Sequence, residues 1–147
     1  MSEHSIALHW NREPHPSDAK TYSRDHQAVF GGGQALRVSA AKTYMGSDNS
    51  ADPEQLFVSA VATCHMLTFL AIAEMQGYVV SSYNDDPTGT VEKSEQGKLV
   101  VSKVTLSPRI EFSGAKVPDQ DALSRLHASA HKNCFIGNST NAQVMVA

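Results

Sequence analysis

The chain has 147 residues, a length that fits one domain, and its 41% hydrophobic content is ordinary for a soluble globular protein. A formal net charge of −3 and the lack of a basic run do not fit a nucleic-acid-binding protein. The N-terminus has no basic segment followed by an apolar run, so we predict no secretory signal. We therefore expect a single cytoplasmic domain over residues 1–147, in a compartment that keeps thiols reduced.

The N-terminal third of the chain has the alternation of apolar and polar residues that is typical of strands. In the first predicted strand, Ile6, Leu8 and Trp10 share one face. Segments rich in Gly, Pro, Asn, Asp and Ser separate the apolar runs and predict loops. The pattern predicts strands at residues 5–10, 21–30 and 35–41, with loops at 11–19 and 42–51.

A long helix is predicted next. Asp52 is a suitable N-cap, Pro53 suits the first helical position, and Gly77 is the predicted stop. Residues 56–73 of this helix carry no Asp, Glu, Lys or Arg, a length near the lower end of a membrane span, roughly 17–25 residues. Polar residues within it and the lack of flanking Lys or Arg argue against insertion. We expect the central buried helix of a globular domain.

The C-terminal part mixes strands with a second helix. Residues 98–112 alternate apolar and polar side chains, so one face is wet, as in an antiparallel sheet. Pro108 indicates an edge or a bulge within this strand. The resulting fold class is α+β. The remaining elements are strands at 78–83, 89–94 and 143–146 and a helix at 119–133.

Cys64 and Cys134 are the first candidates for chemistry. Cys64 lies in the middle of the first helix, where a small buried apolar role is an equal alternative, and Cys134 lies at a helix-to-loop junction. Neither belongs to a CxxC motif, and no Cys/His cluster has zinc spacing. His127 and His131 lack a third ligand, so we predict no metal. We expect both histidines to be partly exposed near a helix end that tolerates positive charge.

The run Asp52-Pro53-Glu54-Gln55-Leu56-Phe57-Val58-Ser59-Ala60, followed by Ala62-Thr63-Cys64, resembles the helix signature of the OsmC/Ohr family. These are osmotically inducible and organic hydroperoxide resistance proteins. The resemblance extends to Arg24 in an early strand, a hairpin, and a second helix ending at Cys134. It implies an α+β fold with strongly curved antiparallel sheets on central helices. It also implies an intertwined homodimer with active sites at the subunit interface.

The resemblance also implies a chemistry without metal or organic cofactor. Cys64 matches the peroxidatic cysteine, whose thiolate attacks the peroxide and becomes a sulfenic acid. Cys134 matches the resolving cysteine, which forms a disulfide with Cys64. The implied partners are a small hydroperoxide and an external dithiol or lipoylated protein as reductant, with no nucleic acid and no membrane.

Arg24 matches the active-site arginine of the family, and Glu54 matches its partner carboxylate. A guanidinium favours the thiolate and the leaving alkoxide, and a carboxylate can hold the guanidinium through a bidentate ion pair. From the residues alone, Arg12 and Arg37 are rivals of Arg24. A helix-dipole role is the alternative for Glu54.

The chain departs from the better-known branches at two places. His65 follows Cys64 where those branches carry a bulky apolar residue, and Phe135 follows Cys134 where they often have proline. Three roles are open for His65 and for His26, which lies on the same predicted strand face as Arg24. These roles are tuning the Cys64 thiol, shaping the substrate pocket, and packing alone. Met66, Phe69 and Phe135 are the predicted walls of an apolar pocket that would favour organic hydroperoxides.

Three functions remain open at this point. The first is a cysteine-based hydroperoxide reductase, which the combination of two cysteines, Arg24 and Glu54 favours. The second is a redox-sensing or stress-linked binding protein with little turnover. The third is a structural or ligand-binding domain in which both thiols are buried and inert.

Overall fold

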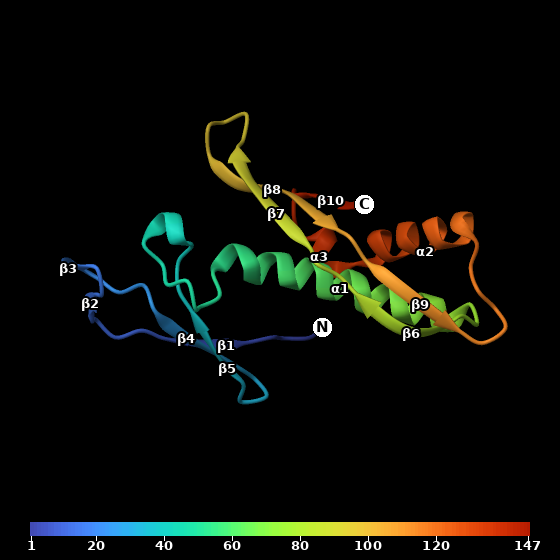
Figure 1. The fold of residues 1–147 in the computed structure, drawn as a ribbon, viewed down its shortest axis with the longest axis horizontal. Coiled ribbons are helices and arrows are strands. Elements are labelled where there is room, and N and C mark those ends of the chain that lie inside the picture. Colours follow the sequence, from blue (N-terminus) through green and yellow to red (C-terminus); the bar gives the residue numbers. More distant parts are fainter. The chain divides into compact units, whose positions relative to one another are not determined.

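The computed structural model describes all 147 residues and has the α+β composition that the sequence predicts (Figure 1). The chain forms two compact units, residues Met1–Leu56 and Phe57–Ala147. The first unit contains strands and a single turn of 3₁₀ helix, Lys42–Tyr44. The second contains most of the helices together with the remaining strands.

The first unit is built around a three-stranded antiparallel sheet in the order β1-β4-β5. The predicted opening strand and third strand are thereby confirmed, with slightly shorter bounds. A small antiparallel hairpin, β2-β3, lies in the connection between the first two strands of the sheet. The bounds are β1 Ile6–His9, β2 Pro14–His15, β3 Asp18–Tyr22, β4 His26–Phe30 and β5 Ala35–Val38.

The prediction of one continuous strand over residues 21–30 is wrong. The chain leaves β3 after Tyr22 and enters β4 at His26. Between them, Ser23 turns toward the first loop: its N–H donates to the Glu13 carbonyl at 2.8 Å, and its carbonyl accepts from the Trp10 indole at 3.0 Å. These two hydrogen bonds pair the N–H and the carbonyl of Ser23 with groups outside the sheet. The residues between β3 and β4 therefore form a connection and not a strand. Parts of the predicted loop at 11–19 instead form β2 and the start of β3.

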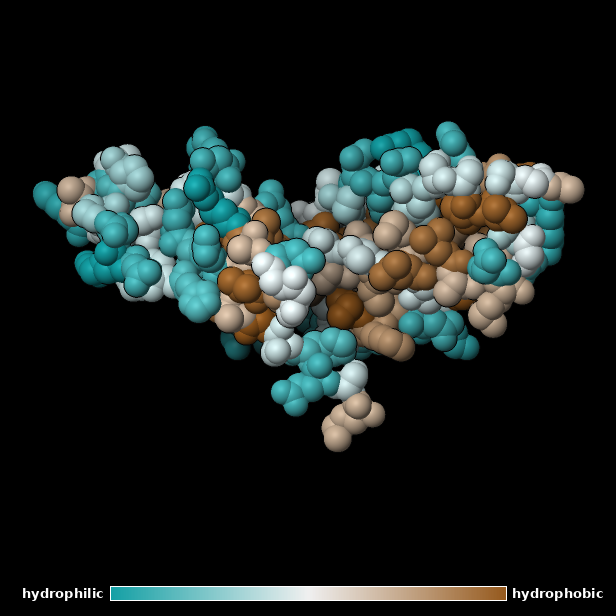
Figure 2. Space-filling view, turned by 90° about the horizontal axis from the view of Figure 1, so that it is seen from below, coloured by the Kyte–Doolittle hydropathy of each residue, from teal (hydrophilic) through white to brown (hydrophobic).

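One face of the three-stranded sheet is apolar and open to solvent in the single chain. Ile6 lies opposite Phe30, and Leu8, Ala28 and Leu36 form the neighbouring row. Directly paired residues share a face, so these side chains make one surface. Ile6 and Leu8 are 54% and 64% exposed. Apolar residues also gather in patches on the molecular face drawn in Figure 2.

Helix α1 spans Pro53–Met75, as predicted, because both ends carry local signals. The Asp52 carboxylate accepts from the Gln55 N–H at 2.8 Å, and the Gln55 side chain accepts from the Asp52 N–H at 3.1 Å, a reciprocal capping box. Gly77 ends the helix at a φ of +80°, a conformation that glycine adopts without strain. By length and composition alone α1 is long and apolar enough to cross a membrane.

The second unit contains two sheets and two further helices. β7 pairs antiparallel with β8, which pairs parallel with β10, while β6 and β9 form a separate antiparallel pair. The antiparallel pairs agree with the sheets that the family resemblance implied, and the parallel pair of β8 with β10 was not predicted. The bounds are β6 Val79–Asn84, β7 Thr88–Lys93, β8 Leu99–Leu106, β9 Arg109–Ser113, α2 Gln120–Asn133, α3 Phe135–Asn138 and β10 Gln143–Val146.

The single strand predicted over residues 98–112 is divided at Ser107–Pro108. Proline has no N–H to donate to a ladder, and the Ser107 N–H donates instead to the Asp85 carboxylate at 2.7 Å. The chain therefore leaves one sheet after β8 and enters the other at β9. The helix predicted at 119–133 is confirmed as α2, with Asp119 as its N-cap.

Helix α1 supplies residues to both core clusters of the second unit. Its first half packs Val58 and Val61 against Val104 and Leu106 of β8. Its second half packs against α2 and the β6–β9 sheet, where the fully buried residues are Phe69, Ala73, Leu126 and Ala130. A helix that contacts core on two sides is apolar around most of its circumference, which explains the residue pattern that resembles a membrane span.

Candidate active site

Cys64 and Cys134 lie together in the second unit, and both are free thiols. Cys64 is in the middle of α1 and half-buried, whereas Cys134 is buried. Cys134 is both the C-cap of α2 and the N-cap of α3. Its place at the end of the predicted helix is confirmed, but the segment after it is the short helix α3 and not the predicted loop.

The first turn of α3 surrounds the two sulfur atoms with hydrogen-bond donors. The N–H groups of Phe135 and Ile136 and the Cys134 thiol lie close enough to the Cys64 sulfur to lower its pKa. The Gly137 N–H donates to the Cys134 Sγ at 3.2 Å. The free N–H groups at the start of a helix are thus directed at sulfur, which favours negative charge there.

These contacts shift the two thiol pKa values in opposite directions. Burial raises the pKa of Cys64, but the hydrogen bonds from Cys134, Ile136 and Phe135 outweigh burial and leave that pKa lowered. Burial and the neighbouring Cys64 sulfur raise the pKa of Cys134. Cys64 is therefore the thiol that ionises first, and Cys134 is the thiol that stays protonated beside it.

His65 is buried in the core beside α2. Its side chain is only 1% exposed, and its Nε2 lies 3.1 Å from Nδ1 of His127 on α2. The two rings stack with centroids 5.4 Å apart and planes 11° apart, and Phe69 lies against the His127 ring at 4.6 Å. One imidazole must donate and the other accept, so the hydrogen bond needs at least one unprotonated nitrogen at the contact.

Three buried polar atoms near this pair have no partner within the chain. They are Nδ1 of His65, the hydroxyl of Tyr83 and Oδ2 of Asp85. Tyr83 packs edge-on against Phe69 at 5.7 Å. Burial, followed by the charge of Asp85, raises the pKa of Tyr83, so this phenol stays protonated.

Burial holds both imidazoles of the pair neutral. It lowers the pKa of His65 to about 4, with the charges of His127 and His131 adding to the effect. Burial also lowers the pKa of His127, while the Asp85 carboxylate partly opposes it. The prediction that both histidines are partly exposed is confirmed for His127, and His131 is exposed. What the pattern did not predict is that the His127 ring stacks on His65, where burial disfavours its charged form.

Arg24 lies in the connection before β4, not in a strand as the family resemblance implied. Its guanidinium donates to the Thr21 hydroxyl and the Tyr22 carbonyl, contacts the Met45 sulfur at 3.7 Å and stacks 4.1 Å from the Tyr22 ring. The predicted ion pair with Glu54 is not formed, since the chain has only the pairs Lys42–Asp48 and Arg109–Asp86.

Glu54 lies in the first turn of α1 and carries a notable unsatisfied atom. Its Oε2 is buried and has no hydrogen-bond partner. A carboxylate oxygen removed from water without a partner is costly, so this group is set up to accept a donor from outside the single chain. Arg12 contacts the Tyr22 ring at 5.7 Å.

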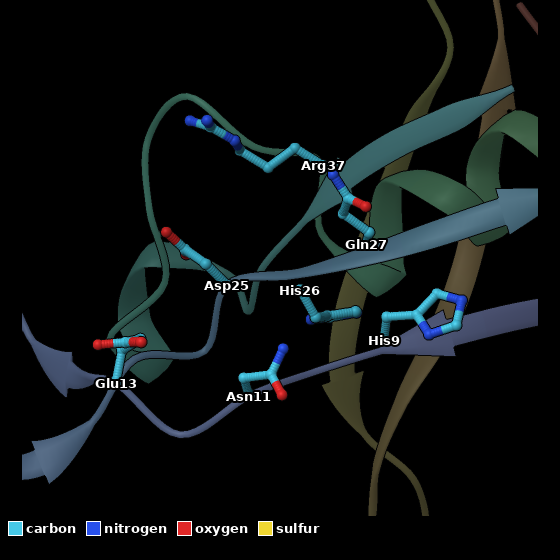
Figure 3. Close-up of a pocket in the computed structure, with 7 residues that line it drawn as sticks. All are labelled: His9, Asn11, Glu13, Asp25, His26, Gln27 and Arg37. Carbon is cyan, nitrogen blue, oxygen red and sulfur yellow. The ribbon is translucent and has the colours of Figure 1, made fainter.

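His26 and Arg37 belong to an open polar pocket of about 420 Å³ in the first unit (Figure 3). Nδ1 of His26 lies 2.9 Å from the Arg24 carbonyl, so it contacts the backbone of that residue and not its guanidinium. Asp25 has a lowered pKa, because it accepts from the Ser47 hydroxyl at 2.6 Å. The pocket is lined by His9, Asn11, Glu13, Asp25, His26, Gln27 and Arg37.

The three predicted walls of an apolar pocket lie in different surroundings. Met66 is half-buried. Phe69 is fully buried and packs in the core with Tyr83 and His127. Phe135 is 80% exposed beside the thiol pair, and its backbone N–H is one of the donors to Cys64. No group of three or more His, Cys, Asp or Glu side chains is arranged to bind a metal ion.

Sequence reasoning did not find the contact between His65 and His127. Nor did it find the N–H groups of α3. The only sequence signal for the contact between His65 and His127 is that each histidine lies on the apolar face of its helix. The N–H groups of α3 have none, because a four-residue helix leaves no periodic pattern.

The chain resembles known proteins over its whole length. The family model described as OsmC-like protein matches residues 46–147. The structure of an OsmC-like protein of unknown function from Vibrio cholerae has 40% sequence identity and a TM-score of 0.93, covering 100% of this chain and 99% of that one. No curated protein matches the sequence.

More distant structures share the fold. The organic hydroperoxide resistance protein OhrB of Bacillus subtilis has 17% identity and a TM-score of 0.71, covering 99% of this chain and 96% of that one. An organic hydroperoxide resistance protein OsmC from Legionella pneumophila has 16% identity and a TM-score of 0.68, covering 100% and 98%. The α+β fold is thus shown by both near and distant structures.

The buried His65 makes stability depend on pH. Its pKa of about 4 lies below the ordinary 6.5, so the unfolded chain binds a proton that the folded chain refuses between these values. The contribution of neutral His65 to the free energy of unfolding is complete above pH 6.5 and is lost as the pH falls toward 4. We expect a loss on the order of 3 kcal/mol in the free energy of unfolding, measured by urea titration.

The matched comparison uses two variants. His65→Leu removes the buried titratable group, and His4→Gln removes an exposed histidine. The unfolding free energy of His65→Leu should fall less steeply between pH 6.5 and 4 than that of the unchanged protein, whatever its absolute stability. His4→Gln should keep the original slope. Equal slopes in all three proteins would contradict the prediction.

Proposed function

Because this chain belongs to the OsmC family, we propose that it is a thiol-dependent peroxidase that reduces hydroperoxides to alcohols, with a preference for organic hydroperoxides. One observation carries the proposal: two neighbouring thiols have pKa values shifted in opposite directions. An inert buried cysteine would have a raised pKa and no donors, whereas Cys64 has several donors and a lowered pKa.

The reaction runs in three balanced steps. The Cys64 thiolate attacks one peroxide oxygen, so an S–O bond forms, the O–O bond breaks, and the departing alkoxide takes a proton to become an alcohol. The Cys134 sulfur then attacks the Cys64 sulfur, forming the disulfide and releasing water. An external dithiol or a lipoylated protein reduces this disulfide and is itself oxidised.

The N–H groups of Phe135 and Ile136 support the first two steps. They stabilise the attacking thiolate because hydrogen bonds to a charged sulfur are stronger than those to a thiol. The raised pKa of Cys134 keeps a proton on the resolving thiol until the sulfenic acid exists. The exposed Phe135 and the half-buried Met66 are apolar neighbours for an organic group on the peroxide, which supports the substrate preference.

Arg24 and Glu54 are proposed to complete the active site in the assembled protein. Arg24 would stabilise the thiolate and the leaving alkoxide, and Glu54 would hold the guanidinium. The unpartnered Oε2 of Glu54 supports this role, because it needs a donor that the single chain does not give it. The contacts of Arg24 to Met45 and the Tyr22 ring are weak enough to exchange for a charged partner.

The working unit is proposed to be a cytoplasmic homodimer. The apolar face made by Ile6, Leu8, Phe30 and Leu36 supports it, since a soluble chain rarely leaves such a face uncovered. Residues on one side of α1, including Ser59, Ala60, Thr63, Leu67 and Ala71, are also exposed and nearly all small. A second copy that covers these surfaces would make α1 a buried helix on all sides.

A peroxide titration of the fully reduced protein tests the mechanism. We expect one equivalent of cumene hydroperoxide to consume both thiols and to yield an intramolecular Cys64–Cys134 disulfide, found by mass spectrometry. Hydrogen peroxide should react more slowly. Cys134→Ser should trap a sulfenic acid on Cys64, and Cys64→Ser should leave the peroxide unconsumed.

Two outcomes of the same titration would count against the proposal. If both thiols survive excess peroxide, the site is inert. If they oxidise once but a dithiol reductant gives no sustained consumption of peroxide, the protein is a redox sensor or binding protein with little turnover. Comparable turnover of both peroxides would remove the preference for organic substrates.

Replacing Arg24 separates it from its rivals. Arg24→Gln should slow sulfenic acid formation by roughly 100-fold, the usual effect of removing one donor to a developing charge. Arg12→Gln and Arg37→Gln are the matched controls, and each should change the rate by no more than about twofold. Stopped-flow consumption of cumene hydroperoxide measures all three, and a larger effect at either control would reassign the role.

The mass in solution tests the homodimer. Light scattering should give twice the 15.9 kDa of one chain. Leu8→Asp should shift the protein toward the single-chain mass, because it buries a charge in the proposed interface. Ala7→Asp, on the opposite face of β1, is the control and should leave the dimer intact. A single-chain mass for the unchanged protein would refute the proposal.

A further inference from the structure

The contact between α1 and α2 determines where Cys134 lies. Figure 1 shows α2 beside α1 and running in the opposite direction, so the C-terminal end of α2 reaches the middle of α1. The apolar part of this contact consists of Phe69 and Ala73 of α1 with Leu126 and Ala130 of α2. Apolar contacts of this kind tolerate small shifts of one helix along the other.

One polar contact interrupts this apolar surface close to the thiols. The hydrogen bond between His65 and His127 is directional, and it joins the residue next to Cys64 to a residue on α2. A buried hydrogen bond specifies one arrangement more strongly than apolar packing does, because any shift leaves both partners unsatisfied in a medium of low dielectric constant.

Helix α2 transmits this position to the resolving thiol. His127 and Cys134 are seven residues apart, two turns or about 10 Å of continuous helix. Helix hydrogen bonds make this segment rigid, and the Cys134 N–H continues the pattern by donating to the His131 carbonyl. A displacement of α2 at His127 would therefore move Cys134 relative to Cys64.

We propose that His65 and His127 are positioning residues for the resolving step, holding α2 against α1 so that the Cys134 thiol stays within reach of Cys64. Neither imidazole touches the reacting sulfur atoms. Closure of the disulfide depends on the pair directly, and the reaction of Cys64 with peroxide depends on it through the N–H groups of α3, which move with α2. The kinetic part of this inference rests on the proposed peroxidase function.

Two histidines also make this contact sensitive to acid. The groups that face the pair are Asp85 after β6, Tyr83 of β6 and His131 of α2. Only Asp85 can balance an added positive charge, and it lies toward His127. A second proton would put two N–H groups against each other and break the hydrogen bond. Protonation therefore loosens the contact that places Cys134.

Substitutions at His127 test the proposal in a buffer of reduced and oxidised glutathione, without peroxide. His127→Leu removes the hydrogen bond, whereas His127→Asn keeps a polar atom near the position of Nδ1. The measured quantity is the equilibrium between the dithiol and the Cys64–Cys134 disulfide at pH 7.5. The equilibrium gives the effective concentration of one thiol at the other. We expect this value to be roughly tenfold lower in His127→Leu, and to lie within about threefold of that of the unchanged protein in His127→Asn.

The same variants are then given one equivalent of cumene hydroperoxide. Disulfide closure from the sulfenic acid should be roughly tenfold slower in His127→Leu. Formation of the sulfenic acid should slow as well, because the N–H groups of α3 near Cys64 move with α2. Only the thiolate form of Cys134 attacks the sulfenic acid. The rate of disulfide closure should therefore fall about tenfold for each unit by which the pH is lowered. Near pH 4, where His65 gains the second proton of the pair, closure in the unchanged protein should fall more steeply than this, and closure in His127→Asn should not.

The two experiments separate the inference from the proposed function. A normal glutathione equilibrium in folded His127→Leu, or a slope of only tenfold per pH unit near pH 4 in the unchanged protein, would overturn the positioning role. If His127→Leu does not fold, the pH slope of the unchanged protein still decides. If peroxide oxidises neither thiol while the glutathione equilibrium depends on His127, the peroxidase function fails and the positioning role stands.

Discussion

The structure depends on the placement of one short helical turn against the middle of α1. Cys64 alone would be a half-buried thiol with a raised pKa, since burial penalises its charged form. The Cys134 thiol and the N–H groups that begin α3 reverse this effect. Both come from the end of α2, so the chemistry of Cys64 depends on how α2 packs. Every step proposed for the protein begins with this arrangement.

Helix α1 connects this site to the rest of the fold. It packs against β8 through its first half and against α2 through its second half, and it holds Cys64 between the two core clusters. A residue at this place is held by packing on both sides, which limits the rotations open to its side chain. The exposed side of α1 and the apolar face of the β1-β4-β5 sheet are the surfaces that the proposed dimer would cover.

The contact between His65 and His127 distinguishes this chain from the family branches that carry an apolar residue after the first cysteine. An apolar residue at position 65 would pack without a directional hydrogen bond and would not titrate. The imidazole pair adds a specific hydrogen bond and a dependence on protons at the contact that places Cys134. Phe135 adds a second difference, because its ring is exposed beside the thiols while its N–H faces Cys64.

The sequence by itself determined those elements whose signals are local. The bounds of α1 follow from the capping box of Asp52 and from Gly77, and Cys134 follows the end of α2 as its pattern predicted. The motif around Cys64 was enough to identify the family. Tertiary structure decided the rest: the break at Ser107–Pro108, the connection that carries Arg24, and the partners of both thiols. These depend on contacts between residues far apart in the chain, such as His65 with His127, whose energies no local pattern encodes.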